Sequence, residues 1–151
     1  MHHYRKSVLG TLFAALSFFT AAELFAQADV IEKRQKLMKS NSADAKAIKA
    51  AAESKDYATI QTKAKDIMGN AEKIVAAFPK GSTVGKTKAK PEIWEKPDEF
   101  AKNPKALSKA ASELADAAKA KDDAAIAVKV KALGEVCGNC HKNFRAEKYS
   151  E

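Results

Sequence analysis

The chain has 151 residues, enough for one domain, and its six glycines and four prolines are few beside abundant alanine and lysine, which favours helices and disfavours a loop-rich or collagen-like chain. With 27 Lys and Arg against 19 Asp and Glu, the formal net charge is +8. The lysines are scattered among alanines and acidic residues without an Arg-rich block, which argues against nucleic acid and leaves solvated helix faces or an acidic protein partner.

The N-terminal segment, residues 1–28, is laid out like a secretory signal peptide. It has a short basic start, a mostly apolar stretch and then Ala26-Gln27-Ala28, an A-x-A cleavage pattern. A permanent membrane anchor is the alternative, because the apolar stretch approaches spanning length, but Glu23 lies within it. We therefore predict cleavage near Ala28, export to the periplasm and an unanchored mature domain, residues 29–151, with a net charge of +7.

The first two helices are predicted from apolar residues at helical spacing. The first starts near Asp29, a good N-cap, and Ser40-Asn41-Ser42 can interrupt or bend it before it continues to about Ala52. The second runs from about Asp56 to Phe78, where Pro79 and Gly81 end it. Their inner faces hold Val30, Ile31, Leu37 and Met38 in the first, and Ile60, Ala64, Ile67, Ala71 and Ile74 in the second.

Residues 79–97 form the one substantial predicted loop, and two further helices follow it. The third helix runs from near Asp98 to about Lys119, with Asn103-Pro104 inside it as a kink or a late start. The fourth begins at Asp122 or Asp123 and continues to about Lys148. Four amphipathic helices with mostly short connections predict an all-α, antiparallel up-and-down bundle.

The fourth helix carries Cys137-Gly138-Asn139-Cys140-His141, and C-x-x-C-H is the attachment signature of c-type haem. Two thiols three positions apart lie on one helical turn, so each can form a thioether to a haem vinyl group, while His141 presents its imidazole to the iron. A redox dithiol or a structural disulfide is the alternative to haem attachment. A zinc site is not expected, because the chain has no other cysteine to complete one. One covalent haem c on Cys137 and Cys140, with His141 as the proximal axial ligand, is the prediction.

A bundle with this motif near its C-terminus resembles cytochrome c′ and its relatives, the class II c-type cytochromes. Three further elements of the sequence are similar to that family: Arg34-Gln35, Pro91-Glu92-Ile93-Trp94 and Arg145. The resemblance implies that Arg34 and Gln35 lie at the haem edge, and that the helix facing His141 decides what occupies the sixth coordination position. It also implies that the protein is a monomer or a homodimer.

In members of the family with an open sixth position, the residue four after the arginine of that pair is apolar, whereas here it is Met38. A thioether can bind iron, and His/Met ligation gives a low-spin centre with a raised potential. Met38 can also be a gap-filler of an Ala-rich helix, and Met68 is a second methionine available for ligation. We predict Met38 as the distal ligand, and the resemblance then points to the low-spin, methionine-ligated branch of the family.

The predicted function is that of an exported monohaem electron carrier, not an enzyme, with acidic redox partners that the basic surface would attract. The mature chain has one histidine, which the iron uses, and no recognisable pairing of a nucleophile with a base. The alternative is a five-coordinate cytochrome c′ that binds or sequesters nitric oxide or carbon monoxide. A second alternative is an adaptor bundle without haem.

Overall fold

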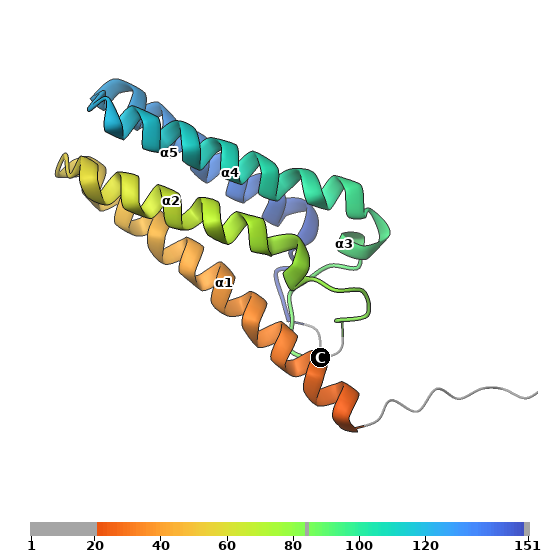
Figure 1. Cartoon of the computed structure of the whole chain (residues 1–151). Helices are drawn as coiled ribbons and strands as arrows, with labels where there is room; N and C mark the ends of the chain where they lie inside the picture. Colours follow the sequence, from red (N-terminus) through yellow and green to blue (C-terminus); the bar gives the residue numbers. More distant parts are fainter. Residues whose placement is uncertain (1–20, 84, 150–151) are drawn as a thin grey trace, which may run out of the picture.

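The computed structural model describes residues 21–83 and 85–149, and this part of the chain forms a four-helix bundle (Figure 1). The long helices are α1 (Ala21–Glu53), α2 (Tyr57–Ile74), α4 (Pro97–Lys119) and α5 (Asp123–Phe144). The shorter η1 (Val75–Ala77) and α3 (Glu92–Glu95) lie between α2 and α4. The predicted all-α antiparallel bundle is confirmed.

The bundle core is built from aliphatic and alanine side chains on the facing sides of the helices. α2 packs against α1 and α4, α4 packs against α5, and α1 also touches α5, which closes the ring of four helices. The many alanines allow the helix backbones to approach closely, and the larger side chains fill the layers between them. The fully buried large residues are Ile48, Ile60, Ile67 and Leu114.

Two matching turns connect the helices at one end of the bundle. In each, a lysine at positive φ, Lys55 at 57° or Lys121 at 56°, precedes an aspartate that starts the next helix. Asp56 and Asp122 each accept a hydrogen bond from the backbone N–H three residues on, at 3.0 and 2.9 Å. These side chains satisfy backbone donors that a helix start leaves without partners, which explains why α2 and α5 begin where the sequence predicts.

The end of the bundle with these turns is also tied together across the helix pairs. Asp123 at the start of α5 accepts hydrogen bonds from Lys55 at 2.6 Å and from the Tyr57 hydroxyl at 2.9 Å. The Lys55 contact raises the pKa of that ammonium and lowers the pKa of the Asp123 carboxyl. All three groups are exposed, so the contact orients the turns and adds little stability.

Pro104 lies inside α4, and the helix continues through it without interruption from Pro97. A proline has no N–H to donate to the carbonyl four residues earlier, which is that of Phe100. The Asn103 side chain replaces this donor: its Nδ2 donates to the carbonyl oxygens of Phe100 at 3.2 Å and Glu99 at 3.0 Å. The helix starts close to Asp98 as predicted, and of the two alternatives at Asn103-Pro104 the late start is excluded.

The ends of α1 and α5 differ from the prediction. Residues 1–20 of the predicted signal peptide lie outside the described residues, and α1 begins at Ala21, so Asp29 is inside the helix, where it pairs with Lys33 at 2.6 Å. Alanine, glutamate and leucine before Asp29 favour helix and extend it toward the N-terminus. Residues 40–42 neither interrupt α1 nor end it. α5 ends at Phe144, where the chain turns into an extended pairing with Ala89.

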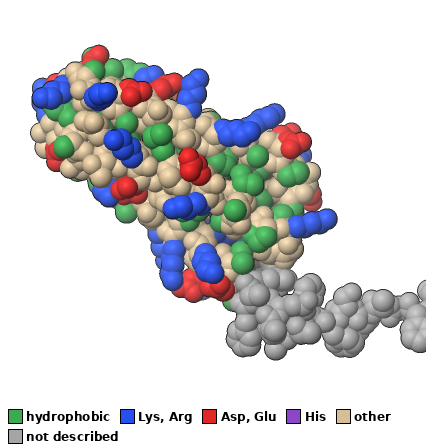
Figure 2. Space-filling view, viewed as in Figure 1, with side chains coloured by type: hydrophobic (Ala, Val, Ile, Leu, Met, Phe, Trp, Pro, Cys, Tyr) green, Lys and Arg blue, Asp and Glu red, His purple; other side chains and the backbone are tan. Residues whose placement is uncertain are grey.

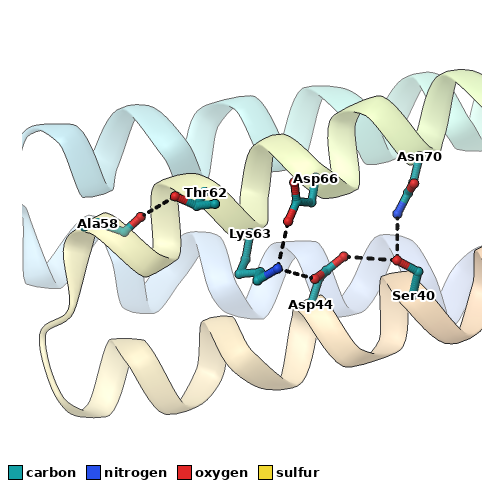
Figure 3. A network of polar contacts seen from close by, with 7 residues as sticks. All are labelled: Ser40, Asp44, Ala58, Thr62, Lys63, Asp66 and Asn70. Carbon is teal, nitrogen blue, oxygen red and sulfur yellow. Dashed lines mark hydrogen bonds and ion pairs between the residues drawn. The ribbon is translucent and has the colours of Figure 1, made fainter.

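A polar network joins α1 to α2 on the outside of the bundle (Figure 3). The buried Asp44 carboxylate pairs with Lys63 at 3.2 Å, and Lys63 also pairs with Asp66 at 2.8 Å. Asn70 Nδ2 donates to the Ser40 hydroxyl at 3.2 Å. A buried carboxylate requires such partners, so the network fixes the register between the two helices.

The lysine at positive φ in each turn offers a direct test of these turns. The left-handed conformation costs a residue with a side chain about 1–2 kcal/mol, and glycine avoids that cost while losing more entropy on folding. We expect Lys121→Gly to raise the free energy of unfolding by about 0.5–1 kcal/mol, measured by urea denaturation of the haem-loaded protein. As the matched control, Lys119→Gly in the last turn of α4 should lower it by up to about 1 kcal/mol. A lower free energy of unfolding for Lys121→Gly would show that the positive φ of Lys121 does not destabilise the turn.

Candidate haem-binding site

A cavity of about 510 Å³ lies inside the bundle at the end opposite the two turns, between α1, α4 and α5. It brings together all six residues that the sequence predicts at the haem site, although they lie on two helices far apart in the chain. These residues are Arg34, Gln35, Met38, Cys137, Cys140 and His141.

The C-x-x-C-H motif occupies the last two turns of α5, where Cys137, Cys140 and His141 are half-buried in the cavity wall. Burial raises the pKa of the Cys137 thiol, and burial together with Cys137 raises the pKa of the Cys140 thiol to about 11. Reactive dithiols have lowered pKa values, so these raised values argue against a redox dithiol. Both thiols stay neutral near pH 7, and a neutral thiol carries the S–H that adds across a vinyl double bond.

His141 also faces the cavity in its neutral form. Burial, followed by the positive charge of Arg145, lowers the pKa of the imidazole. A neutral imidazole has the free nitrogen lone pair that an iron ligand requires, and the lowered pKa keeps that lone pair available in more acidic solution. Arg145 follows α5 directly, and its backbone N–H donates to the His141 carbonyl at 3.0 Å.

The opposite wall of the cavity is one face of α1. Met38 lies on it one turn after Arg34, and the cavity lining continues along the helix through Asn41, Ser42 and Ala45. Met38 is half-buried and packs against the core. Met68 packs against the core from α2 and does not line the cavity, so of the two methionines only Met38 shares this space with His141.

Aromatic side chains form a third part of the wall. The rings of Phe78 and Phe100 meet edge to face with centroids 5.1 Å apart, and Phe100 and Phe144 meet in the same way at 5.3 Å. All three line the cavity. The sequence places them on the inner faces of helices but does not indicate that they surround a cofactor, because a core phenylalanine has the same spacing.

Arg34 has partners that the sequence did not indicate. The residue is 3% exposed, and its guanidinium donates to the Ser82 carbonyl at 3.0 Å, the Ser82 hydroxyl at 2.9 Å and the Thr87 hydroxyl at 2.7 Å. It also lies 4.9 Å from the ring centre of Phe78. Burial lowers the pKa of Arg34, yet a guanidinium remains charged. Within the described residues it forms no ion pair, so this buried cation is solvated by neutral groups only.

Gln35 and Trp94 hold the same loop against the helices. Gln35 Nε2 donates to the Lys86 carbonyl at 2.9 Å, and Trp94 Nε1 donates to the Pro79 carbonyl at 2.9 Å. The loop also pairs with the chain after α5, where the Ala146 N–H donates to the Lys88 carbonyl at 2.8 Å. Residues 79–83 and 85–91 are thereby held at the mouth of the cavity, next to α1 and to the end of α5.

The residues present fit a covalently attached haem. The cavity volume is within the roughly 300–1,000 Å³ of typical cofactor pockets, and aromatic and aliphatic side chains form much of its lining. Two neutral thiols and a neutral imidazole project into it from adjacent turns of α5. Cys137 and Cys140 would hold the porphyrin and His141 the iron, while Arg34 supplies a positive charge at one end.

Comparison with known proteins agrees with this site. The family model described as cytochrome c′ matches residues 29–145. Cytochrome c′ of Rhodospirillum rubrum is 36% identical over 146 residues, covering 95% of this chain and 99% of the relative, and cytochrome c-556 of Agrobacterium fabrum is 34% identical over 146 residues, covering 93% and 97%. The crystal structure of cytochrome c′ from Thermochromatium tepidum has a TM-score of 0.73 at 26% identity, covering 80% of this chain and 97% of that one. The chain belongs to the cytochrome c′ family, whose members bind one covalent haem c.

Proposed function

We propose that this chain is an exported monohaem cytochrome c′ that binds or sequesters nitric oxide or carbon monoxide on the haem face opposite His141. The observation that carries the proposal is the cavity itself, which extends from the C-x-x-C-H motif of α5 to the wall formed by α1. Similarity over nearly the whole chain to a protein named cytochrome c′ supports this function over the electron carrier that the sequence first suggests.

The side chains of α1 leave room for such a ligand. When attached, haem c supplies an iron that can bind a diatomic gas or exchange electrons. On α1, the lining one and two turns beyond Met38 includes the short side chains of Ser42 and Ala45. Met38 is a flexible thioether that can fill this space or withdraw from it, so no rigid group of α1 closes the ligand face.

The second candidate is the electron carrier with His141 and Met38 as the two axial ligands. It is favoured by one observation: Met38 lines the same cavity as His141 and lies in a helix that contacts α5. With both positions filled, the iron would have no place for a gas. The two candidate functions therefore differ in whether the Met38 sulfur is bound.

Arg34 supports attachment of the cofactor in either case. It is a buried cation that neutral groups alone surround in the described residues, and it lines the cavity. A haem propionate would give it the anionic partner that a buried charge needs. The neighbouring Gln35 donates to the Lys86 carbonyl of the loop, and this bond would hold its side chain next to the haem edge.

Export and processing belong to the same proposal. We propose that residues 1–28 are a signal peptide cleaved near Ala28 and that the mature domain, residues 29–151, is periplasmic. The start of the family match at residue 29 supports this boundary. Within residues 21–83 and 85–149, no helix has the length and apolar character needed to cross a membrane.

The surface charge bears on the choice of partner. Lys and Arg side chains are spread over the visible face of the molecule with acidic side chains between them (Figure 2). At the cavity itself, Lys39, Lys88 and Arg145 contribute to the lining. We propose that a redox partner with an acidic patch docks at this mouth, because opposite charges steer association.

Absorption spectra decide between the two functions. We expect the ferric and ferrous spectra of the wild type to be high-spin and to stay so in Met38→Ala, and we expect carbon monoxide to shift the ferrous spectrum of both. Met68→Ala is the matched control, since Met68 does not line the cavity. A low-spin spectrum with a sulfur-to-iron charge-transfer band that Met38→Ala abolishes would establish the electron carrier in its place.

Mass spectrometry tests attachment and processing together. Expressed with haem-attachment machinery, the wild type should begin at or near Asp29 and retain haem after denaturation, because two thioethers hold it. The double variant Cys137→Ser/Cys140→Ser should lose all covalent haem, while each single variant retains one bond. A denatured wild type without bound haem would contradict the attachment, and retention of residues 1–28 would contradict cleavage.

A further inference from the structure

One polar side chain on the α1 wall of the cavity makes no hydrogen bond that stabilises the described part of the fold. The side chain of Asn41 lines the cavity, and its Oδ1 atom is buried without a hydrogen-bond partner in the described part of the chain. No other buried side-chain nitrogen or oxygen among the described residues is in this condition. Buried polar groups are nearly always paired, so an exception needs a reason.

The other amides at the cavity show what a structural role would look like. Gln35 donates to the Lys86 carbonyl, and Asn103 donates to two carbonyls around Pro104. The Asn103 amide replaces the N–H donor that Pro104 lacks, and the Gln35 amide holds the backbone of the loop. Asn41 makes no such bond in the described residues, although Ser40 beside it joins the network between α1 and α2.

The position of Asn41 indicates what the amide faces. It lies three residues after Met38 and seven after Arg34, so it is about 10 Å along the helix from the buried cation. A propionate bound by Arg34 would be at the other end of the wall. Asn41 instead shares the stretch of α1 that includes Met38 and Ala45, across the cavity from α5.

We propose that Asn41 is the residue of the ligand face that distinguishes nitric oxide from carbon monoxide, by donating a hydrogen bond from its amide to bound nitric oxide. The amide carries an NH2 donor and an oxygen acceptor, and rotation about χ2 exchanges their positions. The buried place that Oδ1 occupies can therefore hold the NH2 group, which donates. Bound nitric oxide offers a better acceptor than bound carbon monoxide. The inference rests on the proposed gas-binding function and extends it to ligand selectivity.

The test measures dissociation of nitric oxide and carbon monoxide from the ferrous haem-loaded protein, in the wild type and in Asn41→Leu, which keeps the branched shape of the side chain and removes its polar atoms. A hydrogen bond of ordinary strength corresponds to roughly a fivefold change in rate. We expect Asn41→Leu to release nitric oxide roughly fivefold faster and to raise the N–O stretching frequency of the complex, with little change for carbon monoxide. The matched control is Asn143→Leu, at an exposed amide of α5 that does not line the cavity, and it should change the rate of neither gas.

A second readout is independent of gas binding. Because Asn41 Oδ1 has no partner in the described fold, Asn41→Leu should leave the melting temperature of the haem-loaded, gas-free protein unchanged or higher. A clear fall in melting temperature would show that the amide is structural and would overturn the inference. Equal nitric oxide rates and equal N–O frequencies in Asn41→Leu and its parent would overturn it as well.

The same comparison is made in a Met38→Ala background, so that a bound thioether does not hide the effect. If the wild type binds no gas but Met38→Ala does, the proposed function fails while the role of Asn41 is still decided by Asn41→Leu in that background. If both bind nitric oxide and Asn41 has no influence in either, the gas-binding function stands and the inference about Asn41 fails.

Discussion

The fold depends on filling the space between α1 and α5. A cavity of about 510 Å³ is large for a bundle of this size, and an interior lacking atoms loses the dispersion and transfer energy that packing normally provides. The rings of Phe78, Phe100 and Phe144 stand around this space in contact with one another but do not fill it. A covalent haem c, which the family binds, would complete the hydrophobic core here, and the proposed attachment through Cys137 and Cys140 of α5 would place it in this space.

Arg34 links this cavity to the loop that covers it. The guanidinium holds Ser82 and Thr87 by hydrogen bonds, while its face lies against Phe78, so one buried charge organises residues from α1 and the loop. The loop in turn pairs with the residues after His141 through Lys90, whose N–H donates to the Phe144 carbonyl at 3.0 Å. Arg34 is thus connected through the loop by short polar contacts to the end of α5, which carries His141.

Sequence reasoning succeeded where a feature depends on neighbouring residues. Asp56 and Asp122 cap their helices locally, and C-x-x-C-H defines its own spacing, so both could be placed without a structure. It failed where the competing forces are distant or nearly balanced. The start of α1 depends on propensity outweighing a good N-cap at Asp29, and the partners of Arg34 lie 48 and 53 residues away. The unpaired state of Asn41 is a property of packing, and no pattern of residues announces it.

The cavity-lining face of α1 carries the residues on which the two candidate functions differ. Arg34, Met38 and Asn41 follow each other at helical spacing along the cavity, as a cation, a thioether and an amide. Because α5 fixes the other side of the site through His141 and the cysteines, changes at these three positions alter charge, coordination or polarity without disturbing attachment. Under the proposed functions, coordination would be a competition between the Met38 sulfur and an external ligand on this wall. The balance is then set by how well the rest of the wall stabilises that ligand, and on this wall the amide of Asn41 is the group without another commitment in the described fold.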